Sequence, residues 1–239
     1  MARQQQDVDE LFDVKNAYYV GNFQQAINEA QSIKPSTPLV ALQRDAFLYR
    51  SYIAQGNYRI VQQELKTADP MLQPLQSLVD YLSPGANKPA IVADIDARVA
   101  KGTELANEIF IIVAAMIYYH EDNYEAALKI LHGVSGLEAR ALSLQCLLAM
   151  ARPDLARKQL LLMQELEDDA TLTQLAQAWL NLSQVRRGVS GKRGCYSIFC
   201  SQLLDSHPDH PFSKEYHAKS NELRRLAGQY QYYRCRARL

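Results

Sequence analysis

The stretch that decides the fold reads Tyr118-Tyr-His-Glu-Asp-Asn-Tyr-Glu-Ala-Ala-Leu-Lys-Ile-Leu131. It predicts the end of one helix, a tight turn at 121–123 and the start of a second helix. Tyr124 and Ala127 lie three positions apart, so they share one face of that second helix. The aromatic residue is expected to pack between the two helices, and the small residue lets the helices approach closely.

The same pattern occurs at other places along the chain. Two clear copies and one weaker copy stand at 18–27, 52–61 and 150–156. Phe23 and Tyr58 are 35 positions apart, and Tyr58 and Tyr124 are 66 apart, which is twice 33. A helix pair repeating about every 34 residues is typical of tetratricopeptide repeats. The sequence therefore predicts an all-α, tetratricopeptide-like solenoid of helix-turn-helix repeats. The alternative is a non-repetitive helical bundle that happens to carry three such turns.

The repeats predict three regions along the chain. Residues 1–184 form the solenoid, in which helices at 72–82 and 89–101 make a degenerate third unit without the aromatic. Residues 185–205 form an irregular segment rich in glycine and basic residues, because each glycine in a helix interior costs about 1 kcal/mol. Residues 206–239 hold a C-terminal helix and a basic tail. The apolar side of that helix is expected at Tyr216, Leu223 and Leu226.

Charge is unevenly distributed, although the net charge is zero. Residues 1–184 hold 15 Lys and Arg against 22 Asp and Glu, a net charge of −7. Residues 185–239 hold 11 against 4, a net charge of +7. A basic tail can mark an acidic partner, an anionic membrane surface or RNA, or it can be a solvated helix end.

The compartment is indicated by the polar start of the chain and by its apolar runs. No apolar run follows the first residues, and the most apolar run, Ile109–Tyr119, has 11 residues, too few to span a bilayer. We expect a cytosolic, reduced protein whose four cysteines form no structural disulfides.

Catalytic and metal-binding patterns are weak. The segment Gly188–Arg193 resembles a phosphate-binding loop but lacks its first glycine and its final Ser or Thr. Cys195, Cys200, His207 and His210 have a six-residue middle spacing that is much shorter than in zinc fingers. We therefore expect a protein that is not an enzyme, with no catalytic residue, cofactor or bound metal.

The ordered combination of segments resembles a known family, the epsilon subunits of coatomer, which is the coat of COPI vesicles. The segments that carry the resemblance are 10–28, 49–54, 120–128, 171–182 and 207–219. Members of that family continue through further repeats after the helix that matches 171–182. Here 185–200 stands where those repeats would begin, so the chain resembles a shortened form.

The resemblance implies a non-catalytic structural subunit of the COPI coat. It implies binding to the C-terminal region of the alpha coatomer subunit and stabilisation of the coat for Golgi-to-ER and intra-Golgi transport. The location would be the cytoplasm, peripheral on Golgi membranes and COPI-coated vesicles. The membrane would be reached only through the complex, with no specific nucleic acid and no small-molecule substrate.

The first helices of such repeats line the concave side of a solenoid, where aromatic and methionine side chains are good anchors for a partner. By register, the residues expected to bind the partner are Tyr18, Tyr19, Ile53, Met116, Tyr119 and His120.

Two other functions stay open. One is an adaptor whose basic residues at 186–193 and 234–238 bind RNA or anionic lipid. The other is a peptide-binding co-chaperone, which needs a carboxylate clamp that Lys15, Asn16 and Arg50 only loosely approach.

Overall fold

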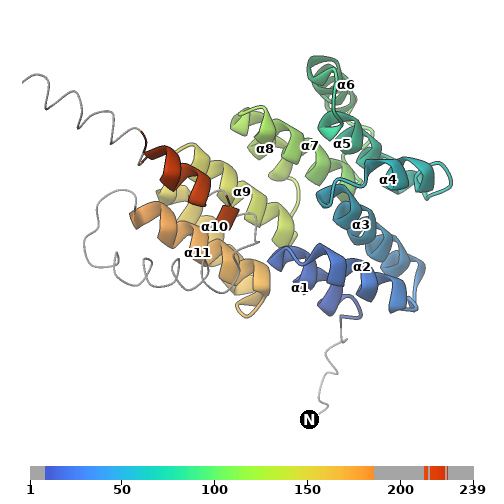
Figure 1. Ribbon diagram of the computed structural model, residues 1–239, viewed down its shortest axis with the longest axis horizontal. Coiled ribbons are helices and arrows are strands. Elements are labelled where there is room, and N and C mark those ends of the chain that lie inside the picture. Colours follow the sequence, from blue (N-terminus) through green and yellow to red (C-terminus); the bar gives the residue numbers. More distant parts are fainter. Residues whose placement is uncertain (1–8, 186–212, 215, 224, 226–239) are drawn as a thin grey trace, which may run out of the picture. The chain divides into compact units, whose positions relative to one another are not determined.

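The computed structural model describes residues 9–185, 213–214, 216–223 and 225 of the chain (Figure 1). The chain divides into two units, 1–183 and 184–239, and each is described by itself. Every regular element found in the described residues is helical, which confirms the predicted all-α, tetratricopeptide-like fold. In chain order the elements are α1 (Phe12–Val20), α2 (Phe23–Ser32), α3 (Pro38–Ala54), α4 (Tyr58–Glu64), η1 (Pro70–Leu72), α5 (Pro74–Leu82), α6 (Lys88–Lys101), α7 (Glu108–His120), α8 (Tyr124–Leu131), α9 (Leu137–Ala149), α10 (Pro153–Glu167) and α11 (Thr171–Val185).

The helices of the first unit stack as repeated pairs. Each first helix packs on its own second helix, as α1 does on α2 and α9 does on α10. First helices also pack on first helices, in the order α1, α3, α5, α7 and α9. This nearest-neighbour order is the packing of a repeat array.

Four of the turns between paired helices share one backbone geometry. The residue two positions before the second helix begins has a left-handed backbone at Gly21, Gly56, Asp122 and Ala151, with φ of 88°, 80°, 58° and 59°. In each turn the next amide donates to a carbonyl five residues back, for example Asn57 N to Tyr52 O at 2.9 Å. This is the Schellman arrangement that ends helices, and glycine suits its left-handed position best. The shared geometry explains why the turns recur so regularly.

We expect exchanging glycine and alanine at two of the left-handed positions to change the stability of the protein in opposite directions. Gly56→Ala should lower the free energy of unfolding by about 1 kcal/mol, and Ala151→Gly should raise it by about as much, because a Cβ is disfavoured at positive φ. A Cβ at Gly56 would meet no atom within 4 Å, so its cost is conformational alone. Urea unfolding measures both, with Gly133→Ala, which lies outside the left-handed region, as the control. Equal stability of all three variants would contradict this account.

The small residue predicted in each second helix lies where two helices meet. Ala26, Val61, Ala127 and Ala156 are all 0% exposed. The turn aromatics pack back on the first helix, with Phe23 5.8 Å from Tyr18 and Tyr124 5.6 Å from Tyr119 between ring centroids. The repeat motif therefore sets the spacing within each pair.

Helix α7 lies at the centre of the largest hydrophobic cluster. Its buried residues run without interruption from Phe110 to Ala115 and continue with Ile117 and Tyr118. A helix that is apolar on all sides is buried on all sides, and α7 packs against α5, α8 and α9. The degenerate third pair, α5 and α6, covers one side of it, close to the bounds expected from the sequence.

The second unit is described only in part. Residues 213–214, 216–223 and 225 are helical, within the range predicted for the C-terminal helix. Tyr216 and Leu223 are 46% and 68% exposed, and Leu226 lies outside the described residues. So do the glycine-rich segment, the basic stretches at 186–193 and 234–238, and the Cys195, Cys200, His207 and His210 array.

The described residues hold neither a membrane-spanning helix nor a metal-binding cluster. No helix among them combines the length and the apolar character needed to cross a membrane. Within the same part of the chain, no three His, Cys, Asp or Glu side chains are grouped so that they could hold a metal ion.

Candidate partner-binding site

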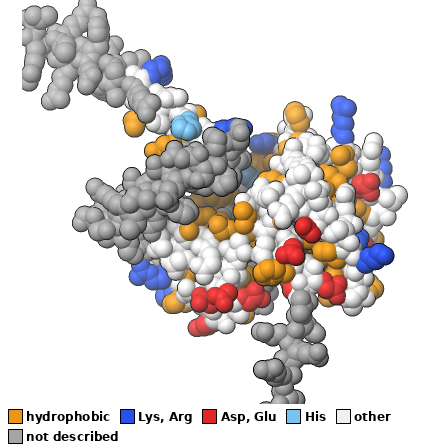
Figure 2. Space-filling model, turned by 60° about the horizontal axis from the view of Figure 1, so that its bottom comes forward, with side chains coloured by type: hydrophobic (Ala, Val, Ile, Leu, Met, Phe, Trp, Pro, Cys, Tyr) orange, Lys and Arg blue, Asp and Glu red, His pale blue; other side chains and the backbone are white. Residues whose placement is uncertain are grey.

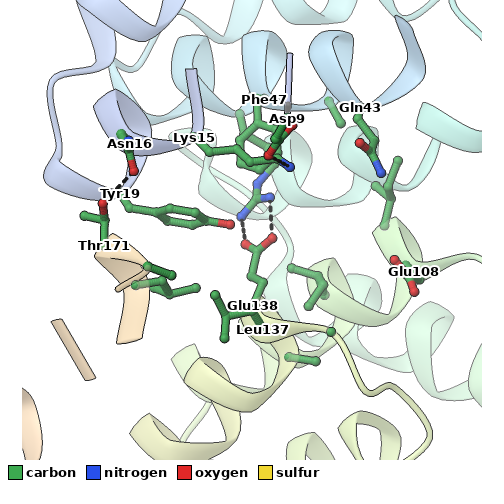
Figure 3. A pocket seen from close by; sticks show the side chains of 18 of the residues that line it. Asp9, Lys15, Asn16, Tyr19, Gln43, Phe47, Glu108, Leu137, Glu138 and Thr171 are labelled. Carbon is green, nitrogen blue, oxygen red and sulfur yellow. Dashed lines mark hydrogen bonds and ion pairs between the residues drawn. The ribbon is translucent and has the colours of Figure 1, made fainter. Parts of the chain in front are cut away.

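A cavity of about 370 Å³ opens in the first unit, and we call it the inner pocket (Figure 3). It is lined by the first helices α1, α3, α7 and α9, by the segment before α9 and by the start of α11. These helices are far apart in the sequence, and the stacking of the pairs brings them to one side. The pocket therefore lies among the first helices of several pairs.

The walls of the inner pocket are largely apolar. They include buried or half-buried side chains from four helices and from the segment before α9, namely Phe47, Ile109, Ile112, Val134, Leu137 and Leu172. Phe12, at the start of α1, also lines the pocket and is 59% exposed. An apolar wall with an exposed aromatic edge is suited to an apolar side chain from outside.

An ion pair crosses the pocket between helices that are not neighbours in the stack. Both terminal nitrogens of Arg50 on α3 donate to the carboxylate of Glu138 on α9. The Arg50 side chain is 10% exposed and lies over the rings of Tyr18 and Phe47, with its guanidinium carbon 4.8 and 5.3 Å from their centroids. Among the described residues its Nε has no hydrogen-bond partner. The Arg50 guanidinium is therefore fixed by an ion pair with one carboxylate and by cation–π contacts with two aromatic rings.

A second bond joins the ends of the same unit. The Thr171 hydroxyl on α11 donates to the Asn16 side-chain oxygen on α1 at 2.5 Å (Figure 3). Tyr19 of α1 extends toward Glu138 and packs against the hydrophobic cluster formed by α9, α10 and α11 (Figure 3). We call the Arg50–Glu138 ion pair and the Thr171–Asn16 hydrogen bond together the clasp.

Burial governs the protonation of the groups around the clasp. Burial disfavours the charged guanidinium, but the Glu138 carboxylate outweighs it and raises the pKa of Arg50. Burial, helped by Glu138, also raises the pKa of the Tyr19 phenol above its usual value. Arg50 is therefore charged while the Tyr19 phenol beside it stays neutral.

The rim of the pocket is acidic. Lys15 Nζ neutralises Asp9 at 2.6 Å, as Arg50 neutralises Glu138. The remaining two carboxylates on the rim, Glu108 and Glu167, are exposed and have no ion-pair partner among the described residues. The pocket thus combines apolar walls with two carboxylates that no described cation pairs with.

The six residues predicted to bind a partner fall into two groups. Tyr18 and Tyr19 lie at the inner pocket, with their ring centroids 5.4 and 5.9 Å from that of Phe47, and Tyr19 lines the cavity. Met116, Tyr119 and His120 lie near the end of α7, away from that cavity. Ile53 is 4% exposed and belongs to the core.

The end of α7 forms a second aromatic surface. His120 is exposed, with its ring centroid 6.1 Å from Tyr81 and 6.2 Å from Tyr119. The Tyr81 hydroxyl donates to Glu121 at 2.6 Å, and burial together with this bond raises the pKa of Tyr81 to about 12. Lys88 Nζ lies 4.8 Å from the Tyr81 ring centroid. Tyr119 and His120 were predicted from the sequence to bind a partner. Tyr81, which is only 2% exposed and supports His120 from within, was not singled out, because the third unit lacks the turn motif.

The residues considered for a carboxylate clamp are already engaged. Lys15 pairs with Asp9, Asn16 accepts from Thr171, and Arg50 pairs with Glu138. All three line the inner pocket. Their side chains are committed within the unit, which argues against recognition of a peptide carboxylate.

Comparison with known proteins identifies the family. The family model described as coatomer epsilon subunit matches residues 7–200. The chain belongs to the coatomer epsilon subunit family. It is 38% identical to coatomer subunit epsilon-2 of Arabidopsis thaliana over 192 residues, which cover 80% of this chain and 64% of that relative. It is 37% identical over 185 residues to coatomer subunit epsilon of Dictyostelium discoideum, covering 73% of this chain and 61% of the relative.

The match to a third member of the family is of similar extent. Coatomer subunit epsilon of Caenorhabditis elegans is 32% identical over 203 residues, covering 83% of this chain and 67% of the relative. The chain thus spans a little under two thirds of the length of the Arabidopsis and Dictyostelium relatives. The resemblance expected from the sequence is confirmed at the level of the family.

Proposed function

We propose that the chain is a non-catalytic structural subunit of the COPI vesicle coat. It binds the C-terminal region of the alpha coatomer subunit and stabilises the coat for Golgi-to-ER and intra-Golgi transport. It acts in the cytoplasm and is peripheral on Golgi membranes and COPI-coated vesicles, which it reaches through the complex. Neither a small-molecule substrate nor a specific nucleic acid takes part.

The observation that carries this proposal is the inner pocket, in a chain that belongs to the coatomer epsilon subunit family. First helices of successive repeats converge there with apolar walls, which suits an elongated protein segment. Tyr19 at the pocket and Met116, Tyr119 and His120 at the end of α7 supply the contacts. Tyr18 and Ile53 pack within the unit and help to position these contacting side chains.

The test is a pull-down of the 239-residue chain by the purified C-terminal region of the alpha coatomer subunit at physiological salt. We expect retention, because the inner pocket is complete within the first unit. Circular dichroism and light scattering establish that the chain used is helical and monodisperse. If such a sample is not retained, this function is wrong for this chain.

The aromatic surface at the end of α7 has its own test in the same assay. The double substitution Tyr119→Ala and His120→Ala should weaken retention by about tenfold, since truncated aromatic anchors at interfaces often cost more than 1 kcal/mol each. His132→Ala is the control, because His132 is exposed at the other end of the same helix pair. Unchanged retention would remove this surface from the interface.

A further inference from the structure

The charges around the inner pocket determine which charge a bound segment should carry. The two rim carboxylates that have no ion-pair partner among the described residues, Glu108 and Glu167, come from two different helices, α7 and α10. The acidic character continues beyond Glu167, because Asp168 and Asp169 follow it and are exposed. Figure 2 shows acidic side chains gathered along the lower edge of one face. Over the whole of residues 1–184 the net charge is −7.

The interior of the same pocket selects for an apolar group. Its volume of about 370 Å³ lies in the range of pockets that bury small ligands, about 300–1,000 Å³, so one aromatic or long aliphatic side chain fits. The buried cation of the pocket, Arg50, is not available to a ligand, because it is paired with Glu138. An acidic group entering from outside would meet the rim charges before it reached the apolar walls.

We infer that the inner pocket receives one apolar side chain from a basic stretch of the alpha coatomer subunit's C-terminal region, with Lys or Arg beside it. The apolar side chain occupies the space between Phe47, Ile112 and Leu172, and the flanking cations face Glu108 and Glu167. This inference rests on the proposed function and deepens it, since it names the chemistry of the bound segment. Charge on the rim steers the encounter and fixes the register, while the apolar side chain holds the complex.

One position allows the pocket to be filled without disturbing the backbone. Gly136 lines the pocket with φ −61° and ψ 152°, an extended conformation that any residue adopts. A Cβ there would meet only Val134 Cγ1, at 3.8 Å, which is an ordinary contact. Gly136→Phe therefore adds a competing ring at the pocket. Gly133→Phe is the matched control, because Gly133 is exposed, has an equally open Cβ position and does not line the pocket.

The rim charges can be tested with an equally close match. Glu108 lies in the first turn of α7, and Glu125 lies in the first turn of α8 without lining the pocket. Both are exposed, so Glu108→Lys and Glu125→Lys lose the same favourable interaction with the helix dipole. Glu108→Lys is combined with Glu167→Lys, and Glu125→Lys serves as the control.

The experiment is titration calorimetry of the full chain with the C-terminal region of the alpha coatomer subunit, at low and at high salt. Gly136→Phe should raise Kd by about 30-fold at both salt concentrations, as expected for the loss of a central anchor. The double charge reversal should raise Kd by about tenfold at low salt and by much less at high salt, because screening removes the contribution of exposed charges. Both control variants should bind as the original chain does.

The outcomes separate this inference from the proposed function. If the original chain binds and Gly136→Phe binds equally well, the inference is overturned and the proposed function stands. If the double charge reversal strengthens binding, the segment is acidic and the inference is also overturned. If the original chain does not bind, the proposed function fails first. If Gly136→Phe instead converts a self-associated chain to a monomer in light scattering, a second copy fills the pocket and the inference is wrong.

Discussion

Replacing Glu138 with alanine is expected to lower the free energy of unfolding by about 2–4 kcal/mol, because it leaves the Arg50 guanidinium buried without its counter-charge. Arg50 is only 10% exposed and its Nε already lacks a partner among the described residues, so no protein group nearby replaces the carboxylate. The 27% exposure of Glu138 lets water reach the empty position, which places the loss below that of a fully buried pair. Chemical denaturation of the two proteins measures the difference.

A double substitution distinguishes the loss of the ion pair from the loss of packing. Arg50→Met combined with Glu138→Leu removes both charges and keeps apolar volume, so its stability should return to within about 1 kcal/mol of the original chain. Glu125→Ala removes an exposed carboxylate from α8 and should change stability by less than about 0.5 kcal/mol. A double variant as unstable as Glu138→Ala would show that the clasp acts by packing and not by charge.

Truncating Phe110, in the first turn of α7, is expected to have a larger effect still. Phe110 is 1% exposed, and its ring lies under the Arg98 guanidinium at 4.7 Å from carbon to centroid. Phe110→Ala should cost about 3–5 kcal/mol, because a cavity remains where helices from several pairs meet. Thermal and urea unfolding give the value, and the loss should also weaken the pocket wall that α7 provides.

The control for this truncation removes the same ring from the surface. Phe12 is 59% exposed, so Phe12→Ala should change the free energy of unfolding by less than about 1 kcal/mol. Phe12 also lines the inner pocket, so the same variant is informative in the binding assay. If the Phe110→Ala and Phe12→Ala variants had the same free energy of unfolding, the central role of α7 would be contradicted.

The helices and their pairing could be predicted because the signal is local. A turn, an aromatic and a small residue three positions later specify one helix pair, and the spacing of three copies specifies the stack. The degenerate pair α5 and α6 was also predicted, from its proline and glycine boundaries, although it lacks the motif. The left-handed geometry at Ala151 was not anticipated, because alanine gives no sign of the backbone it adopts.

The inner pocket itself was not predicted from the sequence. The register of the first helices predicted six partner-binding residues, and of these Tyr19 lines the pocket while Tyr18 packs on Phe47. The clasp could not be foreseen, because Arg50 and Glu138 are separated by 88 positions and Asn16 and Thr171 by 155. Neither pair belongs to the repeat motif, and only the stacking of the helix pairs brings them together. The prediction for 185–205 concerns residues beyond those that the structure describes, apart from the end of α11.

The separation of the clasp residues also bears on the order in which the unit folds. Contacts between neighbouring helices close short loops, whereas the loop closed by Asn16 and Thr171 spans most of the unit, and the entropic cost of closure grows with loop length. Nearest-neighbour stacking is therefore expected to precede the clasp in folding, and the clasp is expected to open first under denaturing conditions. Helix α1 is synthesised before α11, so the pocket that both helices line is complete only after α11 has been made and has packed.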